Sequence, residues 1–407
     1  MTTEERKTSD PRTAPGAVPV LLLLVFLSLI GFGVVIPLLP FFATVFDAKP
    51  WQVSLLFATY SAGQFMGELF WGRLSDRIGR RPVLLITIIG SAVGYIALAW
   101  SPSIWIAVLV RGASGFFAGN MSAIQGYMVD VSPPEKLASR LGLIGSAFGI
   151  GFVVGPALGG LLAQPELGAA GFRPPLIVAS ALCVVAVLGI LAFVRESRQP
   201  GTGAPPAHPF AALGEALRNP ITLQAFAVIF FAFFASSALW SNLGLWLEAR
   251  FAWGPREVGL LMAFTGVAAA MGQGAFAGMA VRRLGPGGTI ALGAGLAAIC
   301  YGAMALSPWA GLASVMLCLG VVGNALWQPA ATAIVSRATH PDRQGAVLGA
   351  ASASGSLARV AGPILGGAMF SGVGPWGPVA LASLFMLPAA WLGWRASRAL
   401  REARRDA

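Results

Sequence analysis

Apolar runs of about twenty residues recur along the whole chain, and they limit its possible folds more than any other feature. A run of this length crosses the ~30 Å hydrocarbon core of a bilayer as a helix. Only 11% of the residues are charged, against roughly 25% in soluble domains. Lipid offers no hydrogen-bond partners, so spans must be helices or closed barrels, and continuous runs exclude alternating barrel strands. The sequence predicts an all-α polytopic membrane protein.

The positions of these runs predict twelve spans in two groups of six. We expect the spans near residues 18–43, 53–71, 82–100, 104–128, 138–163, 174–194, 221–247, 257–280, 289–306, 310–335, 345–370 and 376–394. This divides the chain into a disordered N-terminus (1–17), a six-helix bundle (18–194), a cytoplasmic linker (195–220), a second bundle (221–394) and a basic tail (395–407).

Basic residues predict the orientation. With a cytoplasmic N-terminus, the cytoplasmic segments hold 21 Lys and Arg and the external segments hold four. The positive-inside rule therefore places both termini in the cytoplasm. The net charge of +11 is then explained by topology and does not indicate nucleic acid as a partner.

Residues 72–81 form the most informative motif, a charged segment between two apolar runs with the pattern Gly-x-Leu-x-Asp-Arg-x-Gly-Arg-Arg. It resembles the signature loop between helices 2 and 3 of the major facilitator superfamily. The key positions are Gly72, Asp76, Arg77, Gly79 and Arg80. The alternative is a basic loop that only anchors topology.

The resemblance implies a conformational latch at this loop. In such transporters the carboxylate of Asp76 faces the start of helix 11, near residues 344–346, where a helix N-terminus favours negative charge. We expect Arg77 or Arg80 to hold Asp76 in place and to pair with Asp130 at the end of helix 4.

An internal duplication supports two similar halves. Gly155-Pro156 and Gly159-Gly160 recur 207 positions later in residues 362–367, and Gly72 and Gly79 recur 206 positions later as glycines. One offset across separated segments is typical of transporter halves in parallel repeat. The halves differ where Arg282 stands at the position of Asp76.

Helix 5 carries Gly151, Gly155, Pro156, Gly159 and Gly160, which match the motif of the drug:proton antiporters of the superfamily. Glycines four apart also allow helices to pack closely, so ordinary packing is the alternative. Together with a Gly-x-x-x-x-x-Pro-x-x-Pro stretch at 31–40, the chain resembles the twelve-helix tetracycline and multidrug exporters. Tetracycline exporters carry an acid near position 28, where this chain has Ser28, and this departure argues against tetracycline itself.

Two charges inside spans are candidates for proton coupling. Glu68 is the carboxylate well inside a span, and it is either a proton carrier or a brace for the nearby loop arginines. Arg111 shares a predicted polar stripe of helix 4 with Ser114 and Gln125, which should face water or the other half of the protein. The alternative role for Arg111 is that its side chain extends to the lipid headgroups on the external side. Arg359 has no assigned role.

Helices 7 and 10 supply candidate substrate contacts. The resemblance implies that helices 1, 4, 7 and 10 surround a central cavity, and an apolar site with a few polar groups suits a lipophilic ligand. The aromatic stripe of helix 7 could instead face lipid or pack as core. The predicted contacts are Gln125, Phe230, Phe233, Trp240, Asn324, Trp327 and Gln328.

These features predict a proton-coupled transporter that exports small lipophilic drugs by alternating access. We expect a monomer in the cytoplasmic membrane of a bacterium, driven by the proton gradient without cofactor or metal. The sequence lacks a Gly-x-x-x-x-Gly-Lys phosphate loop and a His-Cys-carboxylate set, so ATP hydrolysis and enzyme activity are not expected. The alternatives are a metabolite exporter or a proton-coupled importer of the same fold and, from other classes, a membrane enzyme or a receptor.

Overall fold

The computed structural model describes residues 17–197, 219–339 and 344–402, and within them it is helical and contains no strand. The helices of the N-terminal half are α1 (Ala17–Val35), α2 (Leu39–Thr44), α3 (Pro50–Ile78), α4 (Arg80–Ala99), α5 (Ile104–Ala118), α6 (Met121–Asp130), α7 (Pro134–Leu162), η1 (Pro165–Phe172) and α8 (Arg173–Phe193). Those of the C-terminal half are α10 (Pro220–Phe251), α11 (Pro255–Met271), η2 (Gly272–Ala277), α12 (Gly278–Ala305), α13 (Ala310–Ala338), α14 (Gln344–Val373) and α15 (Gly377–Glu402).

Eight helical stretches in the described part of the chain are long and apolar enough to cross a membrane. One of them, Pro255–Ala305, contains 51 residues, about twice the length that a single crossing needs. The backbone of Gly285 interrupts this stretch with a non-helical conformation. The predicted fold class, an all-α polytopic membrane protein, is confirmed. Residues 1–16 of the N-terminus expected to be disordered (1–17), most of the linker 195–220 and the end of the basic tail (403–407) lie outside the described residues, and Ala17 begins α1.

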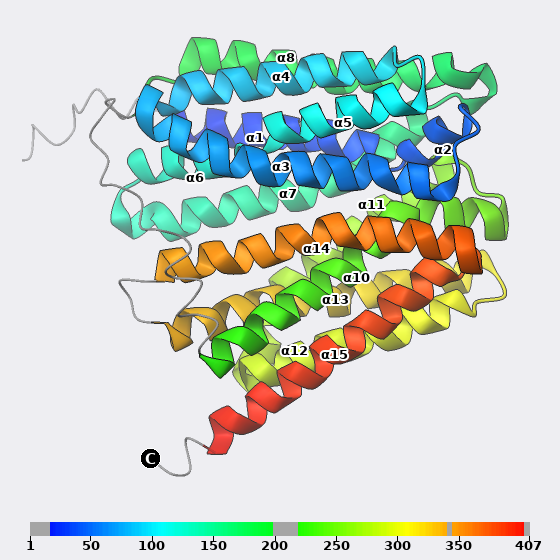
Figure 1. Ribbon diagram of the computed structural model, residues 1–407. Helices are drawn as coiled ribbons and strands as arrows, with labels where there is room; N and C mark the ends of the chain where they lie inside the picture. Colours follow the sequence, from blue (N-terminus) through cyan, green and yellow to red (C-terminus); the bar gives the residue numbers. More distant parts are fainter. Residues whose placement is uncertain (1–16, 198–218, 340–343, 403–407) are drawn as a thin grey trace, which may run out of the picture. The chain divides into compact units, whose positions relative to one another are not determined.

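Two compact units make up the chain. The first contains residues 1–42 and 59–205, and the second contains residues 43–58 and 206–407. In the first unit α1 packs against α7 and α8, and α4 packs against α8 and α5. Figure 1 shows α4 and α8 running side by side.

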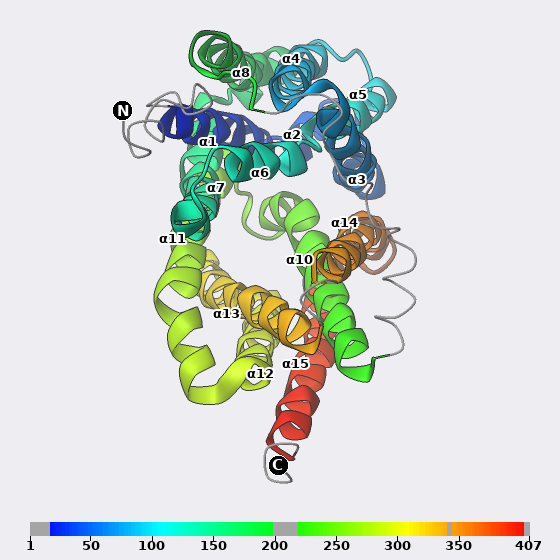
Figure 2. The ribbon, with the colours of Figure 1, turned by 90° about the vertical axis from the view of Figure 1, so that its left-hand side faces the viewer.

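In the second unit α12 packs against both α13 and α15, and α10 packs against α14 and α15 (Figure 2). A short π-helix, η2, separates α11 from α12 at residues 272–277. α12 runs through the segment between 280 and 289, where a cytoplasmic loop was expected, and only the turn at Gly285, with φ +73°, interrupts it.

Two predicted spans are not continuous helices. Span 18–43 is divided into α1 and α2 by turns at residues 36–38, because Pro37 and Pro40 lack the N–H that a helix requires. Span 104–128 is divided into α5 and α6 at Gly119–Asn120. There the Phe116 carbonyl accepts from Trp71 Nε1 at 2.7 Å, and Asn120 donates to Thr87 Oγ1 at 2.9 Å. The single polar stripe expected along helix 4 is therefore interrupted.

The charged segment 72–81 is also more helical than the loop that the sequence predicted. α3 continues to Ile78, and α4 begins at Arg80, so that only Gly79 lies between them. Gly79 has φ +104° and ψ 159°, a conformation that an L-residue rarely adopts. One glycine reverses the chain between these two helices.

Glycines bring α1 and α7 together in the first unit. A Cβ placed on Gly155 would lie 2.7 Å from the Cα of Gly33, and one on Gly151 would lie 2.8 Å from the Cβ of Leu29. A Cβ on Gly159 would overlap the carbonyl of Val34. Gly160 is buried. The antiporter motif therefore forms a face on which helix backbones meet, as small residues do in membranes.

Candidate functional site

An arginine at the beginning of α4 organises the charged end of the first unit. Arg80 pairs with Asp76 at 2.9 Å and with Asp130 at 3.3 Å, and it donates to Ser75 Oγ at 2.6 Å. The Arg80 side chain is only 8% exposed, whereas that of Asp76 is 48% exposed. Arg77 is exposed. The sequence predicted that either Arg77 or Arg80 holds Asp76 and pairs with Asp130. In the structure Arg80 makes both contacts.

A carboxylate that the sequence analysis missed completes this cluster. Glu196, just after α8, accepts from the backbone N–H groups of Arg80 at 2.8 Å and Arg81 at 3.1 Å. These N–H groups belong to the first turn of α4, where a negative charge is favoured by the helix dipole. Ser197 Oγ also donates to Asp130 at 3.0 Å. We name Ser75, Asp76, Arg80, Asp130, Glu196 and Ser197 the charged cluster.

Tight packing surrounds the charged cluster. A Cβ on Gly72 would lie 2.9 Å from Ser122 Oγ, and one on Gly126 would lie 2.5 Å from the Arg80 guanidinium carbon. Gly72 therefore allows α3 to approach α6. The expected contact between Asp76 and residues 344–346 joins the two units and stays a prediction.

A buried arginine lies on an aromatic ring deeper in the first unit. Arg111 of α5 is 2% exposed, and its guanidinium carbon lies 4.0 Å from the ring centroid of Tyr60 in α3. Tyr60 in turn stacks on Phe32 of α1, with centroids 5.3 Å apart. Ser114 donates to the Val110 carbonyl of its own helix at 2.8 Å. Arg111 is therefore held inside the unit by a cation–π contact, a geometry stabilised by ~2 kcal/mol when desolvated.

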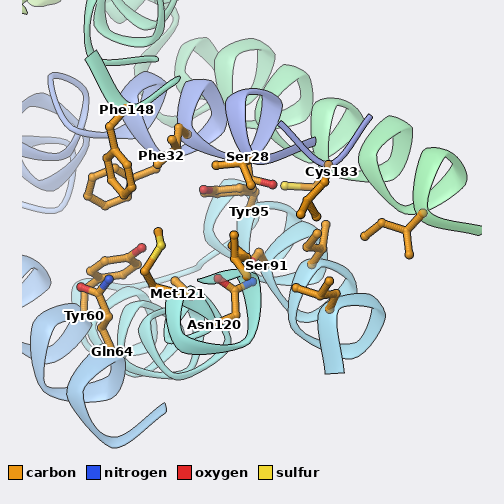
Figure 3. Close-up of a pocket in the computed structure, with 18 residues that line it drawn as sticks. Ser28, Phe32, Tyr60, Gln64, Ser91, Tyr95, Asn120, Met121, Phe148 and Cys183 are labelled. Atoms are coloured by element: carbon orange, nitrogen blue, oxygen red, sulfur yellow. The ribbon is translucent and has the colours of Figure 1, made fainter. Parts of the chain in front are cut away.

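A cavity of about 100 Å³ lies beside this column of side chains, within the first unit. Figure 3 shows the Ser28 hydroxyl directed toward Tyr95 and Cys183, with Tyr60 and Gln64 on another wall. The remaining wall is mostly apolar and includes the Phe32, Met121 and Phe148 side chains. Ser28 Oγ is buried without a hydrogen-bond partner among the described residues. About 100 Å³ holds roughly three waters or one substituent of a ligand, not a whole drug.

None of the predicted residues Glu68, Arg111 and Gln125 lines the cavity. Glu68 is half-buried in α3, one turn beyond the cavity residue Gln64, and a Cβ on Gly119 would overlap the backbone N–H of Glu68. Gln125 is exposed on α6. The break at residues 119–120 separates Gln125, on α6, from Arg111, on α5.

The second unit brings part of its predicted set together. The Phe233 and Trp327 rings meet edge to face with centroids 5.1 Å apart. Asn324 Oδ1 accepts from Trp327 Nε1 at 3.0 Å and from Ser236 Oγ at 3.1 Å. The guanidinium carbon of Arg359 lies 4.9 Å from the Phe233 ring centroid. Arg359, which the sequence left without a role, therefore belongs to this cluster of α10, α13 and α14.

The other predicted members lie apart from that cluster. Phe230 packs with Phe231 and Phe234, with ring centroids 5.8 Å and 6.1 Å away. Trp240 is half-buried, and Gln328 is exposed. Ser237, one helical turn after Phe233 on α10, donates to the Ala358 carbonyl of α14 at 3.2 Å. Phe233 and Ser237 of α10 therefore contact α14.

Sequence reasoning missed Tyr60, Phe32 and Asn120 as wall residues. Tyr60 stands four positions before Gln64, so helical spacing could have placed the two on one face. Phe32 and Asn120 carried no such signal, because Phe32 is one of many apolar residues in α1 and Asn120 stands at the helix break at 119–120.

Paired helix bundles with buried charges beside a small internal cavity are typical of a membrane transporter. Comparison with known proteins agrees, since residues 21–363 match the family model of the Major Facilitator Superfamily. The chain belongs to this superfamily, and the expected family and transporter fold are confirmed. As a member of a transporter family it is not an enzyme.

Individual relatives are similar over nearly the whole chain. It is 30% identical to the class C tetracycline resistance protein of Escherichia coli, covering 87% of this chain and 90% of that protein. It is 25% identical to multidrug resistance protein 2 of Bacillus subtilis, covering 86% and 88%. A solved bacterial homologue of the human lysosomal transporter Spinster has the same fold, with a TM-score of 0.79, 18% identity and coverage of 96% and 98%.

Proposed function

We propose that this protein exports small lipophilic compounds in exchange for protons. The relatives named for tetracycline and multidrug resistance support export of drug-like compounds. The observation that carries the proposal is the buried Arg111, stacked on Tyr60 beside a mostly apolar cavity. A charge held away from water is costly in a membrane protein and is typical of an ion or substrate pathway.

The proposed working unit is a monomer of twelve membrane-spanning helices in a bacterial cytoplasmic membrane, with both termini in the cytoplasm. The excess of basic residues on one side supports this orientation. The proton gradient supplies the energy, and no cofactor takes part. Alternating access by the two halves would expose the substrate to each side in turn.

We propose the cavity beside Tyr60 as the place where one substituent of the substrate binds. Its size fits a ring or an alkyl group, and Ser28 Oγ offers a polar contact that is unused among the described residues. Replacement of the acid of tetracycline exporters by Ser28 favours lipophilic compounds other than tetracycline. Within the second unit, we propose the Phe233, Trp327 and Asn324 cluster as a separate set of substrate contacts.

Glu68 is the proposed proton carrier, and its replacement tests the mechanism. Glu68→Gln mimics a permanently protonated acid, so substrate binding should remain while the imposed pH gradient no longer drives efflux. The measurement is efflux of a lipophilic cationic dye from liposomes that contain the purified protein and an imposed pH gradient. Glu166→Gln, in the exposed segment η1, is the matched control and should transport normally.

Arg111→Ala should abolish dye flux in the same assay, because it removes the cation from the Tyr60 ring. Normal, pH-driven flux in Glu68→Gln would assign Glu68 to a structural role. Dye flux without proton movement in the parent protein would contradict antiport itself.

A further inference from the structure

A second, larger cavity lies in the C-terminal unit, and its wall contains no residue of the candidate transport site. Its volume is about 820 Å³, within the range of ordinary ligand pockets. It lies where α10 and α12 end and α15 begins. Its wall is formed by Trp246, Ala249, Arg250, Gly302, Ala305, Leu306, Pro375, Trp376, Ala380, Ser383 and Leu384.

The wall of this cavity is amphipathic. Arg250 is its one charged member, and no acidic residue contributes to the wall among the residues that the structure describes. Glu248 stands two positions earlier on α10, about 200° around the helix from Arg250, and does not line the cavity. Ser383 uses its hydroxyl to donate to the Ala298 carbonyl at 2.7 Å. The cavity therefore offers one cation within an otherwise largely apolar surface.

Exposed apolar side chains surround the opening. Leu306 is 83% exposed, Leu384 is 59% exposed and Trp376 is 53% exposed. In a membrane protein such side chains contact lipid, and tryptophans at helix ends mark the headgroup level. An opening of this kind admits an acyl chain more readily than water.

Arg250 is positioned to bind a phosphate at the same level. It is exposed at the last turn of α10, and one of its donors reaches the Ser307 carbonyl at 3.5 Å, the upper limit of a hydrogen bond. A guanidinium has five N–H donors in a fork that fits phosphate oxygens. The geometry points to a binding site for an anionic phospholipid, with its phosphate on Arg250 and an acyl chain along Leu306 and Leu384. In the proposed topology the lipid comes from the outer leaflet.

Native mass spectrometry of the full-length protein in detergent tests this site. Titration with phosphatidylglycerol should show one site that binds this lipid more tightly than phosphatidylethanolamine. Arg250→Ala should weaken phosphatidylglycerol binding about fivefold and remove the preference, since one basic residue near a membrane surface contributes about that much. Arg256→Ala, an exposed arginine of the adjacent segment outside the cavity, should bind like the parent.

Ala305→Trp places a bulky ring on the cavity wall and should weaken phosphatidylglycerol binding at the tight site. Equal binding of the two lipids, or an unchanged affinity in Arg250→Ala, would overturn the proposal. Displacement of the lipid by excess inorganic phosphate would identify a site for a free anion and would also overturn it. The measurement needs no transported substrate, so its result is independent of the proposed efflux activity.

Discussion

Gly79 and Gly285 lie 206 positions apart in the two halves, and they make similar turns with different surroundings. Both have positive φ, +104° and +73°, and ψ values of 159° and 170°. At Gly79 the carboxylate of Glu196 lies so close that a Cβ would overlap it, whereas at Gly285 a Cβ would find nothing within 4 Å.

The side chains that follow these glycines differ in the same way. Arg80 follows Gly79 and joins two carboxylates, whereas Pro286 follows Gly285 and can make no such contact. Arg282 stands where the first half has Asp76 and is exposed. The duplication kept the backbone turn in both halves, but only the first half has a charged cluster around it within the described residues.

The largest expected difference between the halves is in the stability lost when Arg80 or Arg282 is replaced by alanine. Arg80→Ala removes a nearly buried guanidinium that joins two partly exposed carboxylates, and the loss of its charged hydrogen bonds should cost about 2.5 kcal/mol. Arg282→Ala alters an exposed side chain and should stay within about 0.5 kcal/mol of the parent. Thermal unfolding of each purified variant in detergent measures both. Equal melting temperatures would show that the charged cluster does not stabilise the first half.

The glycine motif should behave alike in the two halves. Gly159→Val places a side chain against the Val34 carbonyl of α1, and Gly366→Val places one against Asn242 and Ala238 of α10. Each should cost about 2 kcal/mol through overpacking. Gly149→Val is the control, since a Cβ there finds nothing within 4 Å.

The yield and melting temperature of the folded proteins check this prediction. A stable Gly159→Val protein beside an unstable Gly366→Val protein would mean that only the second half uses the motif for packing.

The smallest expected difference separates the two turns. Gly285→Ala should cost about 1 kcal/mol because of the backbone conformation alone. Gly79→Ala should cost about 1 kcal/mol more, because the new Cβ also displaces Glu196 from the N-terminus of α4. Glu196→Gln removes the carboxylate charge. When both alanine variants are made in that background, the difference between their losses of unfolding free energy should become smaller. An unchanged difference would be assigned to sterics and not to charge.

Much of the architecture could be predicted because it depends on local sequence. The apolar runs predict membrane helices, and the 206–207 offset predicts two related halves, since both signals are read within short segments. The positions of the helix breaks were harder to predict from the sequence. The break at 119–120 depends on Trp71 of α3 and Thr87 of α4, which lie far away in the sequence.

Part of the candidate site could also be predicted, because some of its residues belong to short sequence motifs. Asp76, Arg80 and Asp130 were recognisable because a motif or a span end contains them. Glu196 was missed because its partners are backbone N–H groups 115 and 116 positions away. Tyr60 was missed because its role comes from Arg111, on another helix.

By itself, the sequence determined that this chain is a duplicated, all-helical transporter of the major facilitator superfamily, because hydrophobic length and motif spacing are properties of the chain alone. Only the tertiary structure decided that Arg80 joins Asp76 to Asp130, that Arg111 lies on Tyr60, and that Arg359 lies on Phe233. Each of these contacts brings together helices whose mutual distance and rotation depend on how all their neighbours pack, and no single segment encodes that.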